Sequence, residues 1–175
     1  PEIRISINLS VDDLRSPKLP LLLQEQLQLW GISAQQIILE ITERGFVDPQ
    51  TTLPVIAGYR QAGHRISIDD FGTGYSSLSY LQKLDVDTLK IDKSFVETLT
   101  THKTSHLIAE HIIELAHSLG LKTIAEGVET EEQVNWLRKR GVRYCQGWFF
   151  AKAMPPQVFM QWMEQLPARE LTRGQ

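Results

Sequence analysis

Six short apolar segments recur along this chain, and each of them ends on a polar or charged residue. They span residues 3–8, 37–40, 66–69, 88–90, 123–126 and 143–146, and their last residues are Asn8, Glu40, Asp69, Lys90, Glu126 and Gln146. Successive end residues are 32, 29, 21, 36 and 20 positions apart. Each interval has room for one turn, one helix and one return loop, which is the βαβ unit. The recurrence therefore predicts an α/β protein with parallel strands.

The order of residues within the segments predicts which side of the sheet each side chain faces. Side chains alternate along a strand, so Ile5 and Ile7 share one face while Asn8 lies on the other. In the same way Leu39 opposes Glu40. We expect one face of every strand to pack on helices and the other to carry a functional group to the carboxyl end. In a closed βα barrel such groups meet in one mouth.

Short motifs accompany the expected strand ends. The most specific is Ile-Asp-Asp-Phe-Gly-Thr-Gly-Tyr-Ser-Ser at residues 68–77. The others are Asn-Leu-Ser at 8–10, Glu-Ile-Thr-Glu at 40–43, Lys-Ile-Asp at 90–92, Ala-Glu-Gly-Val-Glu at 125–129 and Gln-Gly at 146–147. In order and spacing this set resembles the EAL-domain family of cyclic di-GMP phosphodiesterases, over residues 6–156. The Glu-Ala-Leu signature that gives the family its name is not in the sequence.

The resemblance implies a TIM-type (β/α) barrel that is truncated at its N-terminus. A complete barrel needs roughly 250 residues, so 175 residues fit about six of eight βα units. We expect residues 1–167 to form the C-terminal portion of an EAL-type phosphodiesterase barrel and residues 168–175 to form a tail. Since the signature glutamate is missing, we expect the isolated chain to be inactive.

Charge and composition limit the partners and the compartment. The net charge of −3 provides no basic field for a nucleic acid polymer. No apolar run approaches the ~20 residues of a membrane span, so we expect no membrane contact by this segment. The single Cys145 predicts a reducing, cytoplasmic compartment. A sensory or membrane module of the parent protein would lie upstream and could anchor it in the inner membrane.

Helical periodicity fills the intervals between the strands. Helices are expected over residues 19–30, 49–62, 75–83, 104–119, 130–140 and 155–165. Asp48 is a candidate N-cap for the second helix, and Thr130 with Gln133 matches a capping box. The fourth helix carries an apolar stripe that includes Leu107 and Ile108. The helical tryptophans are expected to serve packing: Trp30, Trp136 and Trp162.

Hard oxygen donors dominate the expected mouth: Asn8, Glu40, Asp69, Asp70 and Glu126. Such a set favours Mg²⁺ or Mn²⁺ over zinc. Taken alone, an Asp-Asp pair is as consistent with a surface or capping role. The family resemblance implies a two-metal site bridged by Asp69. In that arrangement Asn8, Glu40 and the missing glutamate serve one ion, while Asp70 and Glu126 serve the other.

Other polar residues are assigned roles by their match to the family motifs. Lys90 is expected to act on the attacking water or on the transition state, and the alternative is charge balance within the barrel. Glu126 is ligand, general base or both. Gln146 is a substrate-contacting amide or a structural hydrogen-bond partner. Glu43 is expected to position the loop 70–77, and Glu129 either supports the metal ligands from behind or belongs to the cap of the next helix.

The resemblance implies that the chain is part of a metal-dependent phosphodiesterase that opens cyclic di-GMP to linear 5′-pGpG in bacterial signalling. Two alternatives are a catalytically inactive cyclic di-GMP receptor and a protein-interaction module. A homodimer is a further expectation. The histidines of the fourth expected helix are interpreted as solvated or packed, and Cys145 as a core thiol rather than a nucleophile.

Overall fold

Six parallel strands form the centre of the computed structural model, which describes residues 3–46, 49–74, 81, 83–99 and 103–165. The strands are β1 (Ile5–Leu9), β2 (Ile37–Thr42), β3 (Arg65–Phe71), β4 (Thr88–Ile91), β5 (Lys122–Ala125) and β6 (Tyr144–Cys145). They are hydrogen-bonded in sequence order, from β1 at one edge to β6 at the other. This is the order of a βα barrel wall that has not closed on itself, and the parallel α/β prediction is confirmed.

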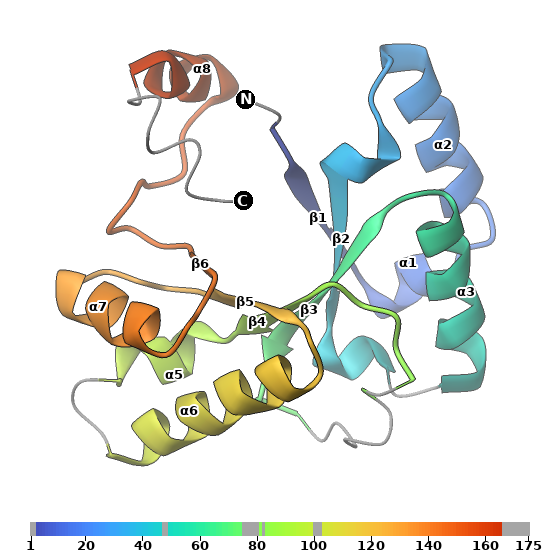
Figure 1. Cartoon of the computed structure of the whole chain (residues 1–175). Coiled ribbons are helices and arrows are strands. Elements are labelled where there is room, and N and C mark those ends of the chain that lie inside the picture. The colour runs from blue at the N-terminus through green and yellow to red at the C-terminus, as the bar shows by residue number, and fades with distance from the viewer. Residues whose placement is uncertain (1–2, 47–48, 75–80, 82, 100–102, 166–175) are drawn as a thin grey trace.

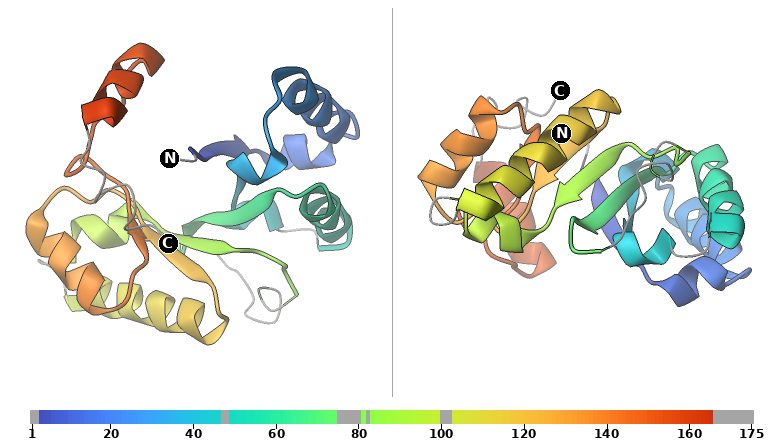
Figure 2. Two further views of the ribbon diagram at one scale, coloured as in Figure 1. Left: turned by 45° about the horizontal axis from the view of Figure 1, so that its top comes forward. Right: turned by 90° about the horizontal axis from the view of Figure 1, so that it is seen from below.

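Helices connect the strands and cover the sheet (Figure 1). They are α1 (Val11–Arg15), α2 (Leu19–Trp30), α3 (Pro49–Gln61), α5 (Lys93–Glu97), α6 (Lys103–Ser118), α7 (Glu131–Lys139) and α8 (Pro156–Gln165), with short 3₁₀ turns at η1 (Ala34–Gln36) and η2 (Glu43–Phe46). Helices α1 to α3 gather beside the first strands and α5 to α7 beside the later ones, while α8 stands apart (Figures 1 and 2).

Local sequence signals account for several helix boundaries. Helix α2 ends at Gly31, whose φ of 62° is left-handed and therefore suits glycine. Helix α7 begins after Thr130, whose side chain accepts a hydrogen bond from the Gln133 amide. The Gln133 side chain accepts one from the Thr130 amide in return, at 3.0 Å. The predicted end of α2 and the predicted capping box are confirmed.

The hydrophobic core lies between the central strands and the helices. Leu39, Ile41, Ile66, Ile68 and Leu89 are fully buried on the helix side of β2, β3 and β4. Each of these side chains contributes about 1.5–3 kcal/mol through burial. The predicted alternation is therefore confirmed for these strands.

Edge strand β1 differs from that prediction. Ile5 and Ile7 are 57% and 37% exposed, and only Leu9 at the end of β1 is buried. The expectation that every strand packs one face on helices is wrong here, because among the described residues α1 reaches only the end of the strand, where Leu14 joins Leu9 in the core.

Two predictions about helix faces are correct only in part. Trp30 is 72% exposed and does not serve packing, whereas Trp136 does pack against the core. On α6, Leu107 and Ile108 of the expected apolar stripe are exposed, whereas Ile112 of the same stripe is buried. The buried face also includes the small residues Ala109 and Ala116. Small side chains allow a helix to approach a sheet closely, which a search for large apolar residues overlooks.

The short helices α1 and α5 were not predicted, because five residues are too few to show a helical period. Asp48, the tail 168–175 and most of the helix expected over 75–83 lie outside the described residues. Within the described part of the chain, no helix is long and apolar enough to cross a membrane.

Candidate active site

Lys90 is the centre of a polar cluster at the carboxyl ends of four strands. Its ammonium nitrogen lies 2.6 Å from Glu40 Oε2, 2.9 Å from Asp69 Oδ1 and 2.6 Å from Glu126 Oε1. Glu40, Asp69 and Lys90 come from β2, β3 and β4, and Glu126 directly follows β5. Three carboxylates that lie between 21 and 50 positions from Lys90 in the sequence thus meet at its ammonium group.

Burial and charge act in opposite directions on this cluster. Burial by itself lowers the pKa of Lys90, but hydrogen bonds to Glu126, Glu40 and Asp69 outweigh it and raise the pKa above its ordinary value. Lys90 therefore stays protonated. Burial raises the pKa of Glu126, and Lys90 opposes that rise. Each ion depends on the others, because a lone buried charge is costly.

A β-bulge brings Asp70 to the same place. Strands β3 and β4 pair regularly at Ile68↔Leu89, but the next aligned pair is Phe71↔Ile91. Two residues of β3, Asp69 and Asp70, therefore lie opposite a single residue of β4, Lys90. Asp70 has a positive φ of 53°, which few residues other than glycine adopt. Such bulges redirect side chains near active sites. The sequence carries a signal of it, because the apolar spacing from Ile68 to Phe71 is three residues instead of two.

Three carboxylates converge at the bulge. One oxygen from each of Asp69, Asp70 and Glu126 lies within 4.8 Å of the others. Burial and the charge of Asp69 raise the pKa of Asp70, as expected when carboxylates are crowded together. Carboxylate oxygens are the ligands that Mg²⁺ and Mn²⁺ prefer, and a divalent cation would relieve the repulsion. The donor set fits such an ion.

Glu43 connects the 3₁₀ turn after β2 with the loop after β3. The carboxylate oxygen Oε2 of this buried residue accepts hydrogen bonds from the backbone amides of Gly72 and Gly74, each at 3.0 Å. A side chain at Gly74 would lie 2.9 Å from the carboxylate carbon, so glycine is needed for this approach. Gly72 has a φ of 98°, in a region open to glycine. The described beginning of the loop is thus anchored beside Asp70.

The remaining predicted site residues lie farther out. Asn8 is aligned with Glu40 across β1 and β2 but is exposed at the sheet edge. Gln146 and Glu129 are exposed and line a pocket of about 630 Å³ that Glu126 also reaches. The backbone amide of Glu129 donates to Gln133 Oε1 at 2.8 Å, so its main chain belongs to the cap of α7.

Sequence reasoning missed two residues of that pocket. Trp148 and Lys152 line it, and the Lys152 ammonium lies 4.8 Å from the centre of a Trp148 ring. Trp148 is 64% exposed, so its ring is available to another molecule. A large exposed aromatic residue directly after the Gln146-Gly147 motif was the available signal. An aromatic face beside a cation suits a nucleobase and its phosphate.

Comparisons of the chain with known families, sequences and structures point to the same family. The family model described as EAL domain matches residues 1–153. The probable cyclic di-GMP phosphodiesterase PdeB of Escherichia coli (strain K12) is 53% identical over 165 residues, which are 94% of this chain and 31% of that protein. The chain therefore spans about a third of the length of this curated relative.

Solved structures agree in fold and sequence. The chain superposes on the PaMucR phosphodiesterase in complex with c-di-GMP with a TM-score of 0.86 and 36% identity, over 89% of this chain and 64% of that one. It superposes on a manganese and cyclic di-GMP complex of Klebsiella pneumoniae BlrP1 with a TM-score of 0.79 and 32% identity, over 86% of this chain and 39% of that one. Relatives that share this fold are thus known with nucleotide and with a divalent ion.

Proposed function

Because this chain belongs to the EAL domain family, we propose that it supplies most of the active site of a metal-dependent phosphodiesterase that hydrolyses cyclic di-GMP to linear 5′-pGpG. The observation that carries the proposal is the cluster around Lys90. The four carboxylates predicted from motifs within this sequence are all present, namely Glu40, Asp69, Asp70 and Glu126, whereas a receptor that had lost catalysis would be expected to lack some of them. PdeB and PaMucR, both named phosphodiesterases, support the same reaction class.

The metal in this proposal is Mg²⁺ or Mn²⁺, held as a pair of ions. Asp69 would serve both ions, Asn8 and Glu40 one of them, and Asp70 and Glu126 the other. Such ions, when bound, make a water more acidic and neutralise charge that develops on the phosphate. The convergence of Asp69, Asp70 and Glu126 supports this assignment. The manganese complex of BlrP1 does so by analogy.

Lys90 and Glu126 are the catalytic residues of the proposal. Lys90 is surrounded by carboxylates, to which its ammonium group donates hydrogen bonds. It keeps Glu40, Asp69 and Glu126 at fixed positions and offers a positive charge where negative charge grows in the transition state. Glu126 contacts Lys90 and opens into the pocket, and it would accept the proton of the attacking water.

Substrate binding is assigned to the pocket of about 630 Å³ beside Glu126. Gln146 would donate to or accept from a guanine edge, since an amide can do both. Trp148 offers a ring on which a base can stack, and Lys152 a charge for a phosphate. Glu129 lies at the rim, and Glu43 would keep the loop after β3 in position against the metal ligands.

Further proposals concern the whole protein. Residues 1–167 would be the C-terminal portion of an EAL barrel and 168–175 a tail. The domain would work in the cytoplasm, alone or as a homodimer, with cyclic di-GMP as ligand. A sensory or membrane module elsewhere in the parent protein would control it.

The decisive experiment measures cyclic di-GMP hydrolysis by the full-length protein with Mn²⁺ and with Mg²⁺. Asp69→Asn and Glu40→Gln should each abolish turnover, because each removes a charged ligand. A matched control is Glu114→Gln on the exposed face of α6, which should retain activity. Turnover that persists after treatment with a chelator would contradict the metal mechanism. Tight binding of cyclic di-GMP without any hydrolysis would favour the receptor instead.

A further inference from the structure

Asp87 joins three strands at the end of the sheet opposite the active site. It precedes β4, its amide donates to the Ile66 carbonyl at 2.9 Å, and its carbonyl accepts from the Lys122 amide at 3.1 Å. Its side-chain oxygen Oδ2 also accepts from the Ile66 amide at 2.9 Å. One residue thus engages both main-chain groups of Ile66 in β3 and one of Lys122 in β5.

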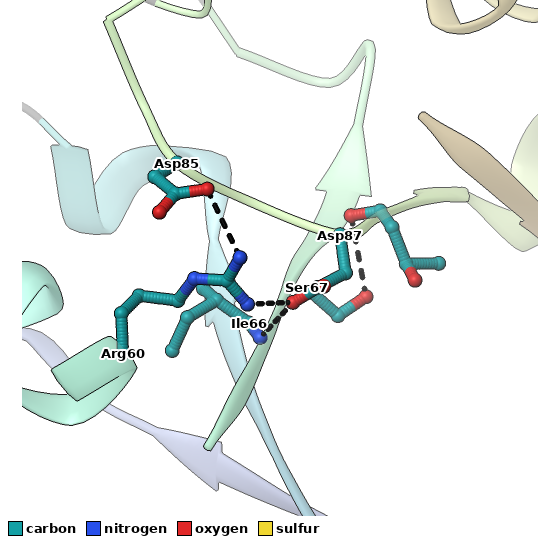
Figure 3. A network of polar contacts seen from close by, with 6 residues as sticks. Arg60, Ile66, Ser67, Asp85 and Asp87 are labelled. Carbon is teal, nitrogen blue, oxygen red and sulfur yellow. Dashed lines mark hydrogen bonds and ion pairs between the residues drawn. The ribbon is translucent and has the colours of Figure 1, made fainter. Parts of the chain in front are cut away.

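Arg60 on α3 holds the Asp87 side chain in place. Its Nη1 lies 2.6 Å from the same Oδ2 atom, and its Nη2 lies 3.0 Å from Asp85 Oδ1 (Figure 3). The side chains of Arg60 and Asp87 are 26% and 28% exposed, whereas that of Asp85 is 76% exposed. The contact with Asp87 is therefore the better shielded one, because exposed ion pairs contribute little.

The ladder between β3 and β4 has few regular pairs. Between Asp87 and the bulge, only the pairs Ser67↔Thr88 and Ile68↔Leu89 are regular. The Ser67 hydroxyl adds a weak contact to the Thr88 carbonyl at 3.5 Å. A slip by one residue would turn Lys90 to the other face of the sheet. A contact at the start of this ladder is therefore well placed to help set the alignment that brings Lys90 to Asp69.

We propose that Asp87, held by Arg60, is a positioning residue that sets the register of β3 against β4 and so places Lys90 beside Asp69. We call the contacts of Asp87 with Ile66 and Arg60 the clamp. Ile66 lies three residues before Asp69, and Asp87 lies three residues before Lys90, so the clamp is equally far along both strands from the two active-site residues. At about 3.3 Å per residue, the clamp acts from about 10 Å away. The inference rests on the proposed function for its kinetic consequence, but its structural consequence can be measured separately.

The kinetic test uses the full-length protein with Mn²⁺ and cyclic di-GMP. Asp87→Ala should lower kcat by about tenfold to a hundredfold, as expected for a misplacement of about 1 Å. KM should stay within about threefold, because no substrate contact is removed. Asp87→Asn keeps an oxygen for the Ile66 amide and should recover most of kcat. Asp85→Ala is the matched control, and its kcat should stay within about twofold because its ion pair is exposed.

The structural readout is amide hydrogen exchange in residues 88–91, with residues 131–139 of α7 as the internal reference. Asp87→Ala should speed exchange in β4 and leave α7 unchanged. If Asp87→Ala fails to fold, Arg60→Ala takes its place, with the same expected direction in both readouts.

A folded Asp87→Ala protein with the parent kcat would overturn the inference, and so would an equal loss of kcat in Asp85→Ala. Wild-type protein that hydrolyses no cyclic di-GMP would refute the proposed function instead. In that case amide hydrogen exchange tests the role of the clamp by itself. Faster exchange in residues 88–91 of Asp87→Ala supports that role, and unchanged exchange rejects it.

Discussion

The central strands β2 to β4 and the edge strands β1 and β6 carry the same kind of sequence but differ in burial. Glu40, Asp69 and Lys90 on the central strands are at most 9% exposed. Asn8 on β1 and Gln146 after β6 are exposed, although they occupy equivalent strand-end positions. The apolar residues follow the same division: Ile41 is fully buried and Ile5 is 57% exposed.

This difference separates two tasks within one site. In the centre, low exposure strengthens electrostatic interactions, so ions there have to be paired and their geometry is fixed. At the edges, polar side chains remain accessible and can exchange water for a ligand at little cost. In the proposed function, the centre would therefore hold the metal ions and act on the scissile phosphate, and the β6 edge would contact the substrate.

Removing the positively charged side chain of Lys90 should cause the largest loss of stability. Lys90→Ala leaves Glu40, Asp69 and Glu126 without their shared partner, and we expect a loss of about 3–5 kcal/mol in the free energy of unfolding. Urea denaturation in the presence of a chelator measures it. Lys122→Ala on the exposed part of β5 is the control and should change stability little. Similar stabilities of the two variants would remove the distinction between centre and periphery.

Apolar truncation should show the same contrast. Ile41→Ala should cost about 2–5 kcal/mol because it opens a cavity in a fully buried site. Ile5→Ala should cost less than about 1 kcal/mol, since most of the side chain already contacts solvent. The two denaturation midpoints, compared at equal m-values, test this. Equal costs in the full-length protein would show that another segment covers β1 there, and would limit the contrast to this chain.

Glu43 tests the connection between the centre and its loop. Glu43→Ala leaves the amides of Gly72 and Gly74 without their acceptor, and we expect a loss of about 1–3 kcal/mol. The rise in Tm on adding Mn²⁺ should also become smaller, because Asp70 begins this loop. Glu114→Ala supplies the control on α6. A Tm rise identical to that of the parent protein would refute a role in metal binding.

The smallest expected effect concerns pH and the amino end of β3. His64 is buried, and burial lowers its pKa below the ordinary value of 6.5, against the opposing effect of the Ile37 and Ala34 backbone. A lowered pKa means that the unfolded chain binds the proton more readily. The contribution of neutral His64 to the free energy of unfolding is then full above pH 6.5, and it is lost as pH falls through the lower pKa that His64 has in the folded state.

The measurement is urea denaturation of the parent protein and of His64→Gln between pH 7.5 and pH 5. The parent should lose more stability on acidification than the variant does. Parallel profiles would show that other groups dominate the acid response.

Sequence periodicity was sufficient for the strands because each one alternates over a buried centre. All six strands lie where the apolar segments predict. However, four of the predicted end residues are inside their strands and not at the last residue, namely Asn8, Glu40, Asp69 and Lys90. The charged ends of β2, β3 and β4 meet because parallel strands bring their carboxyl ends to one edge. The roles assigned to Asn8, Gln146 and Glu129 stay predictions.

Exposure was less predictable than position. Trp30 and Leu107 are large apolar residues at helical positions, and the sequence pattern placed them in packing. Whether such a residue is covered depends on a neighbouring element, and periodicity within one helix contains no information about that neighbour. The same reason explains why Ile5 was expected to be buried.

The sequence alone determined the parallel βα order, the family motifs and the kind of donor atoms at the strand ends, because these follow from local alternation and residue chemistry. Tertiary structure decided three further matters. They are the contacts of the Lys90 ammonium group with three carboxylates, the bulge that brings Asp70 beside them, and the clamp of Arg60 on Asp87. Each of these depends on the alignment of one strand against the next. That alignment is set by contacts between residues far apart in the chain.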